Sequence, residues 1–260
     1  MTTEERRRPD ARPRAFEEVL ARIEERITAD GLTVGDRLPG ERQLAEQLGV
    51  GRSSVREALR VLETLGVVTP QAGRGPDAGA VLTSRPGSAL TDLFRLHLGL
   101  ATLSMREVID TRLMIEQWAA ARAAAAPAPV TSGPAASGPA ASGPAASGPD
   151  RRTATARMAE AIAAMDAARE PAEFVEHDIA FHLALAEASG NRLTVAVMRA
   201  LRDVLRRYAV DAVVRLGDTG GLQDDHRRIH RAIEDGDAGA AAAAVAAHLA
   251  RAYPDSGLPA

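Results

Sequence analysis

Four residues in the C-terminal part of the chain have the types and spacing of metal ligands. Asp178 and His182 are four residues apart in a segment with helical periodicity, so both side chains project from one helix face. His226 opens a segment rich in Asp and Arg, and His248 lies near the end of an Ala-rich segment. If these helices meet in one bundle, three nitrogens and one oxygen could bind a divalent metal and leave coordination positions open. Histidines that are only core or surface residues are the alternative, and His230 competes with His226 for its position.

A second group of residues could bind nucleic acid. Arg52, Arg56 and Arg60 follow one another at intervals of four residues, opposite an apolar face that includes Val55 and Leu59. The guanidinium fork can donate to guanine O6 and N7, and it also pairs with phosphates. A solvated helix face is the alternative interpretation of this row.

Composition limits the chemistry of the 260-residue chain. There is no Cys, so thiolate nucleophiles, disulfides and Cys-ligated metals are excluded, and metal ligands must be His or carboxylates. All 32 basic residues are Arg, which excludes mechanisms that depend on lysine. Residues 1–85 contain 14 Arg and 14 Asp or Glu, so DNA contacts must come from locally arranged arginines. The longest weakly apolar run is far shorter than the roughly 18 residues of a membrane helix, so we expect a cytoplasmic protein without membrane contact.

The N-terminal part has the pattern of a winged helix-turn-helix. Apolar spacing predicts helices over 16–27, 41–48 and 52–65, and the last two are joined by the tight turn Gly49-Val50-Gly51. A two-stranded hairpin over 67–69 and 80–83 follows, with Gly73-Arg74-Gly75 at its tip. Residues 1–14 are predicted to be a disordered arm, and residues 15–85 a DNA-binding domain.

From Leu90 onward the pattern is helical nearly to the end, with stop signals that separate about six or seven helices. Residues 88–253 are therefore expected to form an antiparallel all-α bundle, and the whole chain belongs to the mostly α class. The segment 127–150 contains the repeated sequence SGPAA, whose Gly and Pro break helices and strands. We expect this segment to be a disordered insertion.

The N-terminal pattern resembles the GntR superfamily of bacterial regulators. The resemblance spans about fifty residues, through Gly35-Asp36-Arg37-Leu38-Pro39-Gly40-Glu41-Arg42 and Gly49-Val50-Gly51-Arg52-Ser53-Ser54-Val55-Arg56-Glu57-Ala58-Leu59. It implies a set of DNA-contacting positions on the helix-turn-helix and on the wing: Arg42, Arg52, Ser53, Ser54, Arg56, Gly73 and Gly75.

Two positions depart from the pattern of that family. Gly51 stands where Ser or Thr is usual, and the hydroxyl of those residues can cap the recognition helix and bond a phosphate. The wing tip is followed by Pro76-Asp77-Ala78-Gly79, where the family usually turns directly into a strand.

The C-terminal part is similar to the FCD ligand-sensing domain of the FadR-like branch. The matching stretches are residues 107–116, 178–182 and 188–191, then His226 with 232–237, and finally His248-Leu249. The resemblance implies a divalent ion, zinc or nickel-like, held by the four residues described above. It also implies that Arg112 and Asn191 bind a small carboxylate effector, and the helix near Leu90 favours the seven-helix form of the domain.

Together these features predict a homodimeric transcription regulator that binds a palindromic operator in double-stranded DNA. A small organic acid at the metal would shift the equilibrium between two arrangements of the DNA-binding domains. One alternative is a metal-dependent hydrolase, for which Glu187 or Glu176 would have to be the general base. Another is a regulator for which the metal itself is the signal.

Overall fold

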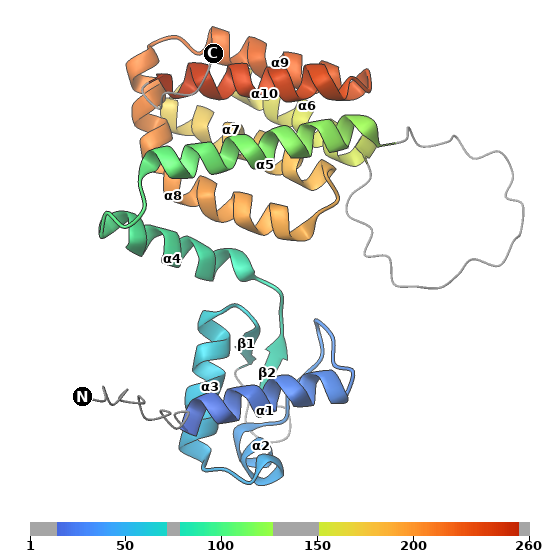
Figure 1. Cartoon of the computed structure of the whole chain (residues 1–260), viewed down its shortest axis with the longest axis vertical. Coiled ribbons are helices and arrows are strands. Elements are labelled where there is room, and N and C mark those ends of the chain that lie inside the picture. The colour runs from blue at the N-terminus through green and yellow to red at the C-terminus, as the bar shows by residue number, and fades with distance from the viewer. Residues whose placement is uncertain (1–14, 72–78, 127–150, 255–260) are drawn as a thin grey trace, which may run out of the picture. The chain divides into compact units, whose positions relative to one another are not determined.

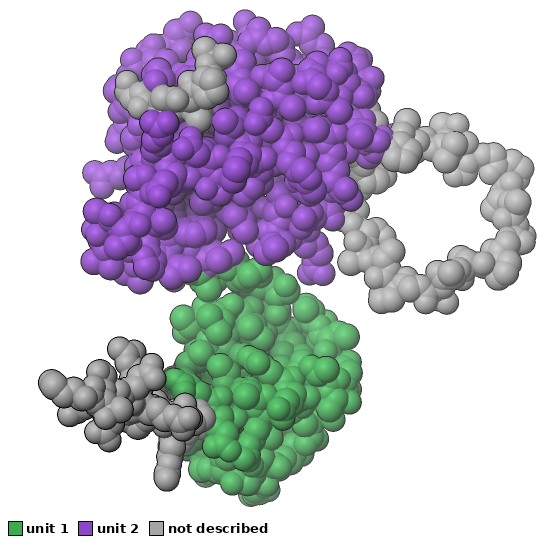
Figure 2. All heavy atoms as spheres, viewed as in Figure 1, with its two compact units in different colours: residues 1–89 green, residues 90–260 purple. Residues whose placement is uncertain are grey.

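The computed structural model describes residues 15–71, 79–126 and 151–254. These residues form two compact units, which divide between residues 89 and 90 (Figures 1 and 2). The predicted N-terminal arm, the wing tip with Gly73 and Gly75, and the SGPAA insertion lie outside the described residues.

Unit 1 contains three helices followed by a two-stranded hairpin, as the sequence predicts. They are α1 (Ala15–Ala29), α2 (Glu41–Leu48), α3 (Arg52–Thr64), β1 (Val68–Gln71) and β2 (Gly79–Leu82). The strands pair antiparallel, with Val68 opposite Leu82, and Arg37 forms a bridge to Val81. The backbone before α2 is therefore held against the hairpin, and the amide of Leu38 also donates to the carbonyl of Ala80.

The recognition helix α3 is positioned by the turn before it and by its apolar face. The turn begins at Gly49, which has the left-handed conformation with φ of 64°. The buried face consists of Val55, Ala58 and Leu62, whereas Leu59 is only half-buried. Leu59, which the apolar spacing places on the same face, packs against this core and also lines a groove beside the hairpin.

Within the described residues, unit 2 is made of helices, and α4 begins at the end of unit 1. The helices are α4 (Pro86–Gly99), α5 (Met105–Ala125), α6 (Arg151–Ala167), α7 (Pro171–Ala188), α8 (Arg192–Leu216), α9 (Gly220–Glu234) and α10 (Ala238–Ala252). Helix α4 starts at Pro86, four residues before the predicted Leu90, because proline is well suited to the first turn of a helix. Among the described residues, no helix combines the length and the hydropathy needed to cross a bilayer.

Local signals fix the ends of the helices that carry the candidate site. A capping box joins Ser104 and Glu107 at the start of α5, and the side chains of Asn191 and Asp237 cap α8 and α10. Helix α5 packs against both α7 and α10, and α9 packs against α10 (Figure 1). Fully buried alanines such as Ala120 allow close packing, so side chains from α5, α7, α9 and α10 converge at the centre of the bundle.

Candidate metal centre and candidate nucleic-acid interface

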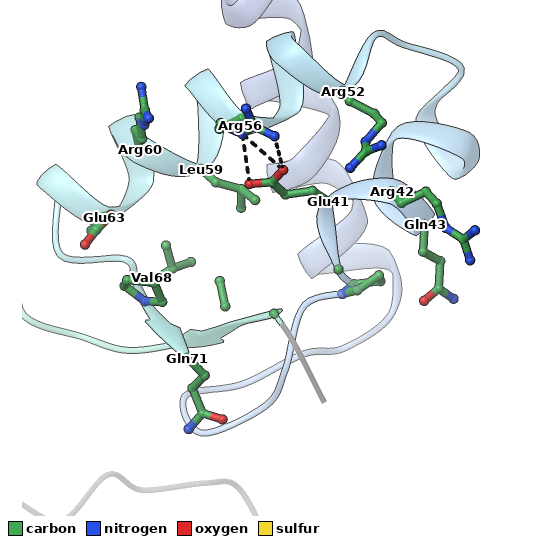
Figure 3. Close-up of a pocket in the computed structure, with 15 residues that line it drawn as sticks. Glu41, Arg42, Gln43, Arg52, Arg56, Leu59, Arg60, Glu63, Val68 and Gln71 are labelled. Atoms are coloured by element: carbon green, nitrogen blue, oxygen red, sulfur yellow. Dashed lines mark hydrogen bonds and ion pairs between the residues drawn. The ribbon is translucent and has the colours of Figure 1, made fainter. Parts of the chain in front are cut away.

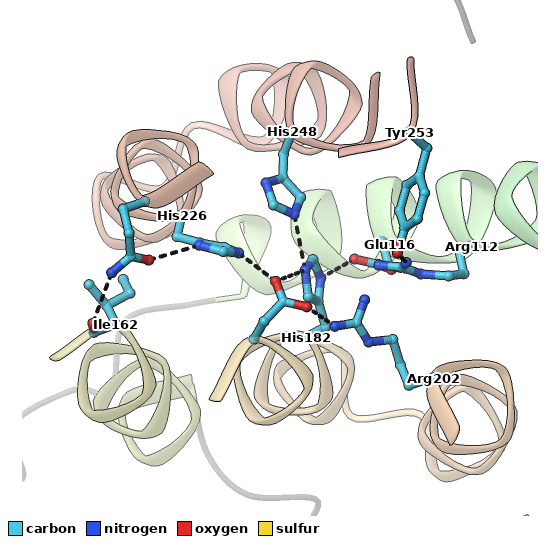
Figure 4. Close-up of polar contacts among 10 residues, drawn as sticks. Arg112, Glu116, Ile162, His182, Arg202, His226, His248 and Tyr253 are labelled. Atoms are coloured by element: carbon cyan, nitrogen blue, oxygen red, sulfur yellow. Dashed lines mark hydrogen bonds and ion pairs between the residues drawn. The ribbon is translucent and has the colours of Figure 1, made fainter. Parts of the chain in front are cut away.

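The four predicted metal ligands converge inside the bundle. Asp178 and His182 come from α7, His226 from α9 and His248 from α10, and all four side chains are buried. One ligand atom from each residue lies within 4.8 Å of the others. The Nε2 atoms of His182 and His248 are 3.2 Å apart, and Nε2 of His226 is 3.1 Å from Oδ1 of Asp178 (Figure 4).

Neighbouring side chains fix the tautomers of two of these histidines. Nδ1 of His182 donates to Oε2 of Glu116, so in the neutral ring the lone pair is on Nε2. Nδ1 of His226 lies 3.1 Å from Oε1 of Gln223, whose amide nitrogen donates to the carbonyl of Ile162. Since Oε1 of Gln223 can only accept, Nδ1 of His226 must donate. In the neutral form that binds metals, both rings therefore present the unprotonated Nε2 to the centre of the cluster.

The donor set and its spacing fit a divalent metal. Two ligand atoms on one ion, at zinc distances and near-tetrahedral angles, are about 3.2 to 3.4 Å apart. Oδ1 of Asp178 lies 3.4 Å from Nε2 of His182 and 3.1 Å from Nε2 of His226. Within the described part of the chain, the buried Nε2 of His226 has no hydrogen-bond partner. A cation would satisfy this lone pair, and imidazole ligands suit zinc or nickel.

A charged network surrounds the cluster. Arg112 donates from Nε to Oε1 of Glu116 at 2.8 Å and from a terminal nitrogen to the hydroxyl of Tyr253 at 2.9 Å. Arg202, from α8, donates to Oδ2 of Asp178. The sequence predicts a site role for Arg112 but not for Glu116 or Arg202. Glu116 lies four residues after Arg112, a spacing that could have revealed it, whereas no local pattern connects Arg202 with Asp178.

Burial and the charges of the network shift the pKa values of its members. Burial acts to raise the pKa of Glu116, but the charges of Arg112 and His182 lower it far below its usual value. Burial and the nearby charge of Arg112 lower the pKa of Arg202 to about 10. Burial and the neighbouring histidine charges hold the pKa values of His226 and His248 well below 6.5. His226 and His248 are thus neutral near pH 7, the form that binds metals.

Other predicted site residues lie elsewhere. His230, the competitor of His226, directs Nε2 to the carbonyl of Thr155 at 3.0 Å and is not part of the cluster. The side-chain oxygen of Asn191 accepts from two backbone amides as the cap of α8, so an effector-binding role for Asn191 stays a prediction. Glu187 pairs with Arg157 and Glu176 pairs with Arg206, so both candidate general bases are engaged in surface ion pairs.

A groove in unit 1 collects the residues expected to contact DNA. It lies between α3, the start of α2 and the hairpin, with a volume of about 980 Å³ (Figure 3). Arg42, Arg52, Arg56 and Arg60 all line it and are exposed. Of the two predicted serines, Ser53 is exposed and Ser54 is half-buried at the start of α3.

The arginines of the groove differ in their partners. Arg56 is paired with Glu41 of α2 at 3.0 Å, and this pairing raises the pKa of Arg56. Within the described residues, Arg52 and Arg60 form no ion pair, so their guanidinium groups are available to phosphates or base edges. The N-cap of α3 is Gly51, which offers no side-chain cap. The missing side-chain cap corresponds to the departure from the GntR pattern at Gly51, where Ser or Thr is usual.

Comparison with known proteins supports the division of the chain into an N-terminal and a C-terminal part. The family described as "Bacterial regulatory proteins, gntR family" matches residues 15–76, and the family described as "FCD domain" matches residues 143–251. Among solved structures, a GntR protein of Streptococcus agalactiae covers 92% of this chain and 99% of its own, with a TM-score of 0.63 and 21% identity. This likeness supports the overall fold.

Curated relatives extend over most of the chain. The Glc operon transcriptional activator of Escherichia coli strain K12 is 29% identical over 83% of this chain and 79% of its own length. A candidate regulator of the L-lactate dehydrogenase operon of the same organism is 29% identical over 91% of this chain and 84% of its own. The regulator LutR of Bacillus subtilis is 26% identical over 84% and 90%, respectively. These matches are transcriptional regulators rather than enzymes.

Proposed function

Because this chain is a GntR-type transcription regulator with an FCD domain, we propose that a small carboxylate bound at a divalent metal controls its affinity for DNA. Asp178, His182, His226 and His248 would hold the ion, which supplies positive charge and open coordination positions for an anionic ligand. Arg112 would pair with the carboxylate of the effector. The name of one relative, which refers to an L-lactate dehydrogenase operon, suggests L-lactate as a first probe.

The observation that carries this proposal is the buried ligand cluster itself. Three imidazoles and a carboxylate meet within 4.8 Å in the buried interior of the bundle, and the cost of burying them is high unless they bind something. Two of the imidazoles are oriented by Glu116 and Gln223, as supporting residues orient metal-bound histidines in proteins.

The DNA side of the proposal rests on the groove of unit 1. Arg52, Arg56 and Arg60 would contact the major groove and its phosphates, with Arg42, Ser53 and Ser54 around them. The wing glycines Gly73 and Gly75, outside the described residues, stay candidates from the resemblance alone. The DNA of a bacterial cell lies in the cytoplasm, where this protein would act.

A connection from the metal centre toward the DNA-binding domain runs along α8. Leu201 and Leu205, beside Arg202, belong to a buried cluster with Val108 of α5, and Phe94 and Leu98 of α4 pack against that cluster. Helix α4 follows β2 after three residues. An effector whose affinity differs between two orientations of α8 would therefore shift the position of α4. Such a difference in affinity between two arrangements is the requirement for allosteric coupling.

We also propose a homodimer that binds a palindromic operator, because two-fold symmetry of a protein is matched by two half-sites. Helix α5 exposes Met114 and Trp118, which are 67% and 43% accessible and one helical turn apart. Such apolar residues are candidates for the subunit contact. Light scattering of the purified chain measures the oligomeric state.

Metal analysis combined with DNA binding tests the proposed function. We expect about one zinc or nickel ion per chain, lost in the double variant His182→Ala/His248→Ala. His177→Ala is the matched control, since His177 lies on α7 but lines a separate surface groove. DNA from the upstream region of the gene should be retarded by the native protein, and L-lactate should change that affinity only when metal is present.

Each departure from these results has a distinct meaning. DNA binding without bound metal would remove the metal from the proposal and leave the regulator. DNA binding that responds to a chelator but to no acid would make the metal itself the signal. Bound metal without DNA binding would contradict the proposed function as a whole.

A further inference from the structure

Two buried arginines lie beside the metal centre and line the same cavity. Arg112 is fully buried and Arg202 is 2% exposed. They enclose a cavity of about 20 Å³ together with Asp178, His248 and Tyr253. Figure 4 shows both guanidinium groups on the same side of His182, away from His226.

Each of these arginines keeps a buried donor without a hydrogen-bond partner in the part of the chain that the structure describes. Within the described residues, Nη2 of Arg112 and Nε of Arg202 have no hydrogen-bond partner. Arg202 uses a terminal nitrogen for Asp178, so its Nε is not required to orient that ligand. An unpaired donor in the core is costly, and a charged one more so.

The balance of charge in the site also favours an anion. Arg112 and Arg202 are offset by Glu116 and Asp178, so these four groups sum to zero when the histidines are neutral. A divalent ion leaves two buried positive charges without compensation. A carboxylate that accepts from both arginines would supply negative charge and satisfy both free donors.

We propose that Arg202 is a second carboxylate-binding residue of the effector site, and that the site selects acids of two or three carbon atoms. This inference rests on the proposed function and assigns its ligand class more narrowly. The cavity is large enough for about one water molecule, so the carboxylate fits only with small adjustments of its lining. On α8, Ala209, Ala212 and Val213 form an apolar part of the lining, so each further carbon atom of the acid would require a larger displacement of these side chains.

Calorimetric titration of the zinc-loaded, full-length protein tests this proposal. The probes are glycolate, L-lactate, hexanoate and citrate. We expect the two short acids to bind at least about 10-fold more tightly than the two larger ones. Comparable or tighter binding of hexanoate or citrate would overturn the size limit.

The role of Arg202 is tested with Arg202→Lys, which keeps the positive charge beside Asp178 but removes the planar guanidinium and its Nε–H. We expect the affinity for L-lactate to fall about 10- to 100-fold, with zinc content unchanged. Arg206→Lys is the matched control, because Arg206 is one turn further along α8 and pairs at the surface with Glu176. It should change the affinity less than twofold.

A measurement on the native protein covers the case in which Arg202→Lys is unstable or loses zinc. The Nε–H resonance of Arg202 should move when L-lactate is added to the zinc-loaded native protein. Binding of L-lactate without such a shift, or equal affinity of Arg202→Lys and native protein, would overturn the role of Arg202 and leave the proposed function intact. If none of the probes binds the zinc-loaded native protein, the proposed function and this inference fail together.

Discussion

The two candidate sites use the same pair of residue types in opposite ways. In the groove of unit 1, Glu41 and Arg56 form an ion pair at the surface, and neighbouring arginines extend into solvent. In the bundle of unit 2, Glu116 and Arg112 form an ion pair that is inaccessible to solvent and linked to a metal-ligand cluster. Water screens the first pair, whereas the second depends on its protein partners alone.

This difference assigns different tasks to the two regions. A solvated arginine exchanges water for phosphate oxygens at little cost, so it is suited to a partner that binds and dissociates. A buried arginine keeps its position because every alternative leaves a charge unpaired, so it is suited to recognising one small ligand with fixed geometry. The comparison predicts that equivalent substitutions have unequal consequences in the two regions.

The largest expected effect comes from removing Glu116. Glu116→Ala leaves Arg112 without its carboxylate and His182 without its acceptor, so we expect the free energy of unfolding of unit 2 to fall by about 3 to 5 kcal/mol. Denaturant titration followed by the fluorescence of Trp118, the single tryptophan, measures it. Glu41→Ala, the exposed counterpart, should leave thermal unfolding by circular dichroism nearly unchanged. Equal losses in the two variants would contradict the comparison.

Acid should weaken unit 2 of the metal-free protein. Because the folded pKa values of His226 and His248 are well below 6.5, the unfolded chain binds protons there that the folded chain does not. The contribution of these groups to stability is therefore complete above pH 6.5 and is lost as the pH falls below it. Between pH 7.5 and pH 5.5 we expect a loss of about 2 to 3 kcal/mol. His248→Gln should show a clearly smaller loss, and a loss of the native size in that variant would be evidence against this cause.

The sequence was sufficient for the parts of the molecule that local patterns determine. The helix-turn-helix, the hairpin and the clustering of Asp178 with three histidines were predicted and are confirmed by the structure. Turn glycines and apolar spacing determine the first two, and the ligand cluster came from i, i+4 spacing together with the family resemblance. The contact of Arg202 with Asp178 joins two helices through tertiary packing, and no spacing in the sequence encodes it.

In the groove, Arg52→Ala should reduce DNA affinity without reducing stability. Arg52 is exposed and forms no ion pair within the described residues, so its removal leaves no buried group unsatisfied. Loss of a phosphate or base contact should weaken operator binding by about 10- to 100-fold. Fluorescence anisotropy with labelled operator DNA measures this. An unchanged affinity would place Arg52 outside the interface, and a large drop in melting temperature would remove the distinction between the two regions.

The smallest expected effect concerns the start of the recognition helix. Gly51 is the N-cap of α3, with φ of −68° and ψ of 142°, a conformation open to any residue. A Cβ there would lie 3.7 Å from Oγ of Ser53, which is ordinary contact, so a serine fits without strain.

Gly51→Ser should therefore supply the missing cap and raise stability by a few tenths of a kcal/mol. Its hydroxyl would also stand where a DNA phosphate can accept from it, so we expect operator affinity to increase by about two- to fivefold. Gly51→Ala separates the two contributions, because it fills the same space without a hydroxyl. If Gly51→Ala increases operator affinity as much as Gly51→Ser does, the gain comes from restriction of the backbone at the helix start and not from a hydrogen bond of the hydroxyl. DNA binding in the groove would then depend less on exposed polar groups than its exposed arginines indicate.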